Sequence, residues 1–156
     1  FIYALNISKP EEIGWYEIKK YAEKENCNVL ITPSSGYIEC SEMFGKNEHY
    51  TYNTITEWCN MIFSSKLVVT TSFHGVVFSI LFHTPFVYVP LNGKFEKGNS
   101  RVLDLLDLLN LQSRIYLPTS NINSIIENYI DWKTVDDLLK GKQKESLDFL
   151  QKALKK

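Results

Sequence analysis

One stretch decides the expected fold: Lys66-Leu67-Val68-Val69-Thr70-Thr71-Ser72-Phe73-His74-Gly75-Val76-Val77-Phe78-Ser79-Ile80-Leu81-Phe82-His83. Residues 67–70 are apolar and β-branched, which is typical of a buried strand in a parallel sheet. The residues that follow place apolar side chains at helical spacing, so a helix is predicted there. Ser72 lies between the two as a favourable N-cap, and the first N–H groups of the helix then lack intrahelical partners. Together with the helix dipole, these N–H groups favour an anion at this turn.

The segment before this stretch predicts a strand, a helix and a second strand. Residues 1–7 are apolar and read as a central strand, and Ser8-Lys9-Pro10-Glu11 has the pattern of a capping box with proline in the first helical turn. The helix ends near Asn26, residues 27–32 form the second strand, and residues 33–36 form a turn. A strand, helix and strand in this order indicate a parallel βαβ unit.

Further elements are expected on both sides of the opening stretch. Residues 37–53 are loop-rich with a short strand near residues 50–52, and Thr54-Ile55-Thr56-Glu57 is a second capping box for a helix that ends near Ser65. Residues 85–89 predict an edge-like strand, because Pro85 has no N–H for a ladder. After it the sequence predicts a loop at 91–99 with Ser100 as N-cap, a helix at 101–110, a short apolar stretch at 114–117, a helix at 121–130 and a lysine-rich helix from 131.

Composition excludes several classes of function. The 156 residues carry a net charge of −1, with 44% hydrophobic and 22% charged residues, so a nucleic-acid-binding surface is not expected. No apolar run reaches membrane-spanning length, and no signal peptide is evident. The chain starts at Phe1 inside an expected strand, so we expect a piece of a longer protein. The widely spaced Cys27, Cys40 and Cys59 favour a reducing compartment and form no zinc pattern, and we expect no cofactor.

Two separated motifs resemble the C-terminal half of the polysaccharide pyruvyl transferase family. The first is Thr71-Ser72-Phe73-His74-Gly75-Val76-Val77-Phe78-Ser79-Ile80 with Thr84-Pro85-Phe86 after it, and the second is Ser100-Arg101-Val102-Leu103-Asp104-Leu105-Leu106. They occur in the family's order, and the resemblance covers roughly residues 57–114.

The alternating elements predict an α/β fold with an open, mostly parallel, Rossmann-like sheet and helices on both faces. The resemblance implies one half of a two-domain GT-B-like arrangement. Residues 1–130 would be the Rossmann-like C-terminal domain. Residues 131–156 would be helices that pack on the same domain or on a missing N-terminal half.

The resemblance also implies a reaction, the transfer of a pyruvyl group from phosphoenolpyruvate to two hydroxyls of a sugar, forming a ketal. The acceptor would be a sugar or lipid-linked glycan of a cell-surface polysaccharide. The chemistry needs an acid at the methylene carbon, stabilisation of the departing phosphate, and a base. The base and the sugar site would lie in the missing half, so the fragment alone is expected to be inactive. We expect a cytoplasmic location, with a peripheral position at the inner face of the membrane as the alternative.

Two loops at carboxyl ends of strands are candidates for the donor site, residues 71–75 and residues 91–101. His74 is the candidate catalytic residue, as the acid or as a phosphate ligand, and both uses require a protonated imidazole. Arg101 offers a bidentate fork to phosphate or carboxylate. The residues expected to bind phosphoenolpyruvate are Thr71, Ser72, Phe73, His74, Gly75, Ser100 and Arg101.

Each of these residues has a structural alternative. His74 can satisfy a neighbouring carbonyl, Ser72 can act only as a cap, and Arg101 can pair with Asp104 on its own helix. Gly75 either allows close backbone approach or packs its helix tightly on the sheet.

Other polar and aromatic residues are given structural roles. His83 lies nine residues after His74, on the opposite helix face, and is expected at a cap or interface. Residues 140–156 are expected to be the solvated side of an amphipathic helix, with a membrane-surface role as the alternative. Tyr37 and residues 50–52 are candidates to line a cleft.

Three functions therefore remain open. They are the donor side of a pyruvyl transferase, the nucleotide-sugar half of a GT-B-type glycosyltransferase, and a non-catalytic domain. The second would need an acidic residue placed for a ribose, and the sequence offers no convincing candidate.

Overall fold

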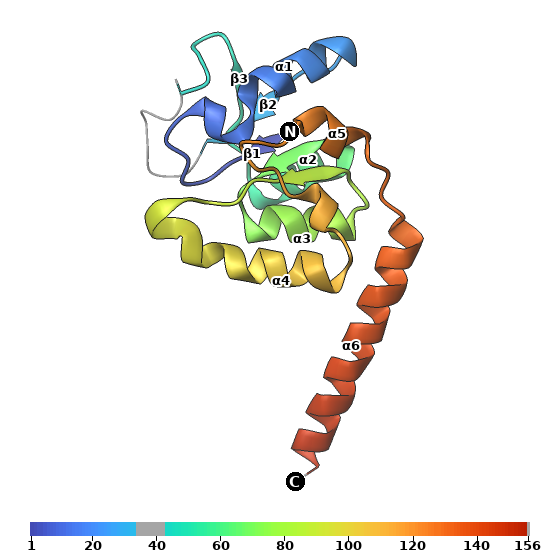
Figure 1. Ribbon diagram of the computed structural model, residues 1–156. Coiled ribbons are helices and arrows are strands. Elements are labelled where there is room, and N and C mark those ends of the chain that lie inside the picture. The colour runs from blue at the N-terminus through green and yellow to red at the C-terminus, as the bar shows by residue number, and fades with distance from the viewer. Residues whose placement is uncertain (34–42, 156) are drawn as a thin grey trace.

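The computed structural model describes residues 1–33 and 43–155, which form a five-stranded parallel sheet (Figure 1). The strand order is β3-β2-β1-β4-β5, and every neighbouring pair is parallel. The strands are β1 (Ile2–Tyr3), β2 (Leu30–Ile31), β3 (His49–Tyr50), β4 (Val68–Thr70) and β5 (Phe86–Tyr88). The order reverses between β1 and β4, and ligands of open α/β sheets bind at such a switch point. The expected α/β class with a parallel, Rossmann-like sheet is confirmed.

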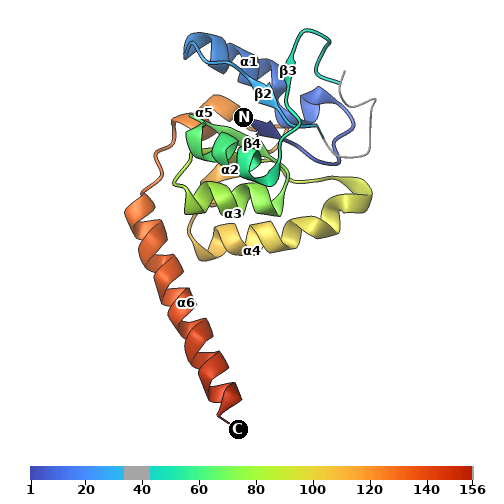
Figure 2. The same ribbon diagram turned by 180° about the vertical axis from the view of Figure 1, so that it is seen from behind.

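Helices cover both faces of the sheet (Figures 1 and 2). The α-helices are α1 (Trp15–Lys24), α2 (Ile55–Ser64), α3 (Phe73–Leu81), α4 (Ser100–Leu108), α5 (Ile122–Glu127) and α6 (Trp132–Leu154). Short 3-10 helices are η1 (Pro10–Ile13), η3 (Gly93–Asn99) and η4 (Gln112–Arg114). Successive strand residues point to opposite faces, so Val69 packs with the side of α1 and α5 while Val68 packs with the side of α2, α3 and α4. The described chain thus has one apolar core on each face of the sheet.

The N-terminal capping box does not form, whereas the second one does. Gly14 adopts a left-handed conformation (φ 69°) and separates η1 from α1, so the first α-helix starts at Trp15 rather than near Ser8. Glu12, not Glu11, accepts a hydrogen bond from the Ser8 N–H. At Thr54 the capping box is complete, as predicted. The turn expected at 33–36, apart from its first residue, and Tyr37 and Cys40 lie outside the described residues.

The segment before α4 also differs from its prediction. Residues 93–99 form η3 instead of a loop, and Ser100 is the first residue of α4 instead of its N-cap. The cause is Asn99, which has helical backbone angles and whose side chain binds both the N–H and the carbonyl of Leu91 over 2.8 Å. The chain therefore turns helical earlier than the position of Ser100 suggested.

Helix α6 contacts the body of the protein only through its first turns. Val135 is buried, and Leu138 and Leu139 pack against the core of the α3 and α4 face. His83 stacks on Trp132 with ring centroids 5.1 Å apart, and its Nε2 lies 2.9 Å from Asp136 Oδ1. The expectation that His83 lies at an interface is confirmed. Beyond these turns the helix extends away from the sheet (Figures 1 and 2).

Candidate functional site

Two threonine side chains hold the carboxyl end of β4 to the segment that follows β1. Thr70 Oγ1 donates to the Tyr3 carbonyl over 2.7 Å and accepts from the Ser72 N–H over 3.0 Å. Thr71 Oγ1 donates to the Leu5 carbonyl over 2.8 Å and accepts from the Leu5 N–H over 2.7 Å. Because a hydroxyl can both donate and accept, each one supplies hydrogen-bond partners for backbone groups where the pairing of β1 with β4 ends. The turn before α3 is therefore fixed at the switch point of the sheet.

Helix α3 begins directly after this turn because Gly75 allows a close approach to β4. A Cβ atom at Gly75 would lie 2.3 Å from Thr70 Oγ1, closer than side chains approach one another. The sequence left two roles open for Gly75, close backbone approach or tight packing of its helix on the sheet, and the structure shows the tight packing. Ser72 is extended (φ −94°, ψ 135°) and takes the N-cap position as expected, although its side chain makes no capping hydrogen bond.

The start of α3 leaves several donors free within residues 1–33 and 43–155. The first intrahelical bond runs from the Val76 N–H to the Ser72 carbonyl over 3.1 Å, so the N–H groups of Phe73, His74 and Gly75 make none. Ser72 is only 8% exposed, and its hydroxyl also makes no hydrogen bond to the described residues. A helix N-terminus with free N–H groups attracts an anion.

Arg101 and His74 both contact the Phe73 ring. The guanidinium carbon of Arg101 is 5.1 Å from the Phe73 ring centroid, and the rings of Phe73 and His74 meet edge to face at 5.8 Å. This cation–π contact joins the start of α4 to the start of α3. Within the described chain Arg101 forms no ion pair with Asp104, and the His74 ring makes no hydrogen bond. The exposed imidazole and guanidinium are therefore both available to a ligand.

The second predicted loop contributes to the site unevenly. Ser100 is exposed, and its hydroxyl donates to the Lys97 carbonyl over 3.3 Å, so no described contact joins it to α3. Sequence reasoning missed Asn99, whose side-chain oxygen also accepts from the Tyr88 hydroxyl over 2.9 Å. Burial raises the pKa of Tyr88 to about 12, so this hydroxyl remains a donor at neutral pH. The sequence did contain one sign of this role, because an asparagine just before an expected helix often binds nearby backbone groups through its side chain.

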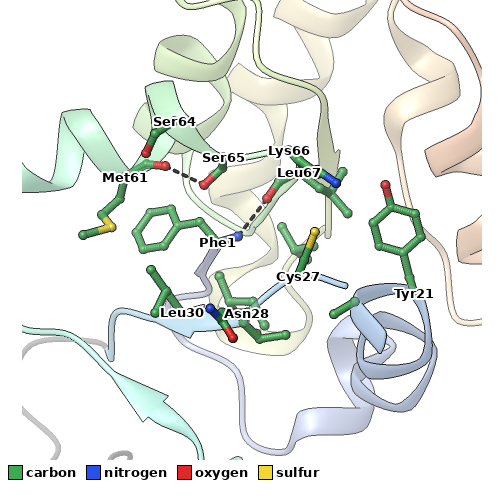
Figure 3. Close-up of a pocket in the computed structure, with 14 residues that line it drawn as sticks. Phe1, Tyr21, Cys27, Asn28, Leu30, Met61, Ser64, Ser65, Lys66 and Leu67 are labelled. Carbon is green, nitrogen blue, oxygen red and sulfur yellow. Dashed lines mark hydrogen bonds between the residues drawn. The ribbon is translucent and has the colours of Figure 1, made fainter. Parts of the chain in front are cut away.

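A pocket of about 250 Å³ lies at the amino-terminal ends of the strands (Figure 3). It lies between the starts of β1, β2 and β4 and the ends of α1 and α2, with Tyr21, Cys27 and Lys66 among its lining residues. The backbone nitrogen of Phe1 lies 2.8 Å from the Leu67 carbonyl oxygen there. Because ligands of parallel sheets bind at the carboxyl ends of strands, this pocket is separate from the candidate site.

Neither a metal-binding cluster nor a membrane-spanning helix occurs in the described part of the chain. Within residues 1–33 and 43–155, no three His, Cys, Asp or Glu side chains gather into a group that could hold a metal ion. In the same part of the chain, no helix combines the length and the apolar composition that crossing a bilayer requires.

Comparison with known proteins gives one match. A family model described as polysaccharide pyruvyl transferase matches residues 4–92, which is more than half of the 156-residue chain. The matched range includes the turn between β4 and α3 with His74, and it ends just before η3, so Arg101 lies beyond it. No curated protein and no solved structure matches the chain.

Proposed function

The chain belongs to the polysaccharide pyruvyl transferase family, and we propose that it is the donor-binding half of such an enzyme. In this proposal the donor is phosphoenolpyruvate, and the pyruvyl group passes to a sugar or lipid-linked glycan of a cell-surface polysaccharide or its precursor. The product is a ketal, and inorganic phosphate is released. Of the three functions that the sequence left open, the family match supports this one.

The observation that carries the proposal is the stack of Arg101 on Phe73 beside the free N–H groups of α3. Phosphoenolpyruvate carries two anionic groups, a phosphate and a carboxylate. A helix N-terminus suits one anion, and an arginine fork with one face on an aromatic ring suits the other. The stack orients the guanidinium and brings the two motifs to one place.

The proposed chemistry assigns His74 to proton transfer or to phosphate binding. Protonation of the methylene carbon turns the CH₂ group into a methyl and leaves positive charge at the adjacent carbon. One sugar hydroxyl attacks that carbon and loses its proton, and the C–O bond to phosphate breaks with its electron pair. The second hydroxyl then attacks the same carbon and closes the ketal, and its proton passes to the released phosphate. A protonated His74 can supply the first proton or can donate to the departing phosphate.

The sugar site and the general base are proposed to lie on another half of the enzyme. Among the described residues the site offers anion-binding groups, but no carboxylate pairs with His74, and the reaction needs a base near the attacking hydroxyl. The free thiols of Cys27 and Cys59 fit a reducing compartment, so we place the enzyme in the cytoplasm.

An amide-resolved NMR titration with phosphoenolpyruvate tests this proposal. We expect shifts centred on residues 72–75 and on Arg101, and inorganic phosphate alone should reproduce them only at the α3 N-terminus. At a hundredfold excess over its dissociation constant, the donor should add about 2.7 kcal/mol to the free energy of unfolding. His74→Ala should remove most of this stabilisation while the domain stays folded.

Two controls make the titration decisive. His49→Ala changes another exposed histidine, on edge strand β3, and should leave phosphoenolpyruvate binding unchanged. A uridine or guanosine diphospho-sugar is titrated separately. Shifts with the nucleotide sugar alone would favour the glycosyltransferase, and donor binding that survives His74→Ala unchanged would contradict the assigned role of His74.

A further inference from the structure

The end of α6 with Lys155 after it, residues 140–155 and here called the outer half, forms no hydrogen bond or ion pair with the rest of the described chain and belongs to neither apolar core. Every residue in this range is exposed, whereas Leu139 just before it is still partly buried. Figures 1 and 2 show this part of the helix extending away from the sheet in both views. Isolated helices of about this length are marginal in water. Its stability is therefore expected to come from a surface that covers it.

One side of the outer half is apolar. Leu147, Leu150 and Leu154 are spaced three and four residues apart and share a face, with 58%, 53% and 84% of their surface exposed. Leucines on one side of an otherwise polar helix are typical of a segment that lies in a membrane interface.

Charge is divided unevenly between the outer half and the body. Residues 140–156 contain six lysines and two acidic residues, a net charge of +4, which leaves −5 on residues 1–139. At the helical period Lys140 and Lys144, seven and three residues before Leu147, lie on its side of the helix, whereas Lys152 lies across the helix from the leucines. The stems of Lys140 and Lys144 can therefore reach along the leucine face while their ammonium groups stay in water.

We propose that the outer half of α6 binds the surface of a membrane that contains anionic lipids. The leucines enter the boundary between headgroups and acyl chains, and the bordering lysines pair with lipid phosphates. The negative charge of residues 1–139 keeps the body off the same surface, so the helix sets the orientation. A second copy of the helix is a poorer occupant, because two +4 segments repel and because Lys142 and Gln143 interrupt the apolar stripe between Leu139 and Leu147.

Vesicle flotation of the whole 156-residue chain tests the proposal without phosphoenolpyruvate. We expect the chain to float with vesicles of phosphatidylcholine and phosphatidylglycerol and to stay in solution with phosphatidylcholine alone. Leu150→Gln with Leu154→Gln should weaken binding at least tenfold, because the apolar transfer is lost. Lys140→Gln with Lys144→Gln should weaken it about 25-fold, since each lysine near an anionic surface contributes roughly fivefold.

Matched variants on the body separate a local effect from a general one. Leu117→Gln alters a leucine that is 50% exposed, and Lys94→Gln with Lys97→Gln removes two exposed lysines of η3. These variants should bind vesicles as the wild type does. The proposal is overturned if the chain ignores anionic vesicles, if it floats equally with neutral ones, or if the body variants weaken binding as much. It is also overturned if sedimentation without lipid shows a dimer that Leu150→Gln with Leu154→Gln dissociates, because a second copy then covers the face.

Discussion

Gly75 is the residue at which the candidate site tolerates least change. Its missing side chain lets α3 start against Thr70, whose hydroxyl fixes both the end of β1 and the Ser72 N–H. We expect Gly75→Ala to cost about 1–3 kcal/mol of folding free energy, because the new methyl must push α3 away from a buried strand. Urea unfolding measures this loss, and the shift of α3 should also weaken phosphoenolpyruvate binding.

A second glycine provides the control for this substitution. Gly98 has nothing within 4 Å of the position where its Cβ would lie. Gly98→Ala should therefore leave stability unchanged or raise it slightly. Equal losses at the two glycines would mean that the contact with Thr70 is not the cause. A smaller loss from Gly75→Ala in a Thr70→Ala background would locate the cost at this pair.

Single residues of the site were predicted where local patterns decide their positions. A buried strand that runs into a helix places Ser72 and His74 at the carboxyl edge of a sheet, whatever the rest of the chain does. Arg114 shows the opposite case, because an arginine in a short apolar stretch gives no sign of burial. It is 1% exposed and donates to the carbonyls of Phe86 and Asn128 over 2.8 and 2.9 Å. Such contacts depend on segments far apart in the sequence, which local pattern does not reveal.

At the scale of elements, the capping box of α2 can be tested directly. The Thr54 hydroxyl accepts from the Glu57 N–H over 3.3 Å, and the Glu57 carboxylate accepts from the Thr54 N–H and hydroxyl over 2.8 Å each. Thr54→Ala should cost about 1 kcal/mol at neutral pH, because it removes the N-cap acceptor. Urea unfolding of the wild type and the variant measures the difference.

The cost of Thr54→Ala should shrink in acid. Hydrogen bonds from the Thr54 N–H and hydroxyl hold the pKa of Glu57 below its usual value. A carboxyl whose pKa is lower in the folded than in the unfolded protein stabilises the fold at pH values above its unfolded pKa. This stabilisation is lost as the pH falls through the folded pKa. Wild type and variant should therefore converge in part as the pH falls below the usual pKa of a glutamate, about 4.3. Thr56→Ala, an exposed threonine in the same turn, should show neither the loss nor the pH dependence.

The elements themselves were predicted better than their ends. Five strands and the main helices occur where alternation and capping patterns placed them, but β1 is two residues long, whereas the sequence predicted a strand of seven residues. Hydrogen-bonded pairing, not apolar composition, sets strand length, and pairing depends on the neighbouring strand. The segment before α4 was predicted wrongly for a similar reason, because Asn99 closes it through contacts with Leu91 and Tyr88.

At the scale of the whole molecule, the chain consists of a two-sided sheet domain and a helix that leaves it. The apolar periodicity of α6 predicted a helix but not where it parts from the body. Its first turns and its outer half carry similar leucine spacing, and only the packing of Val135, Leu138 and Leu139 distinguishes them. The position of α6 is therefore a property of the assembled core.

Two truncations test this division of α6. A chain that ends at Lys140 should have a free energy of unfolding within about 0.5 kcal/mol of the full chain's, because every residue it lacks is exposed or lies outside the described range. A chain that ends at Asp131 also loses Val135, which is 2% exposed, and the stack of Trp132 on His83. It should lose about 3 kcal/mol or more, since burial of one large apolar side chain contributes about 1.5–3 kcal/mol. Urea unfolding measures both chains. Equal losses would mean that the outer half stabilises the body, and this outcome would contradict the division of α6.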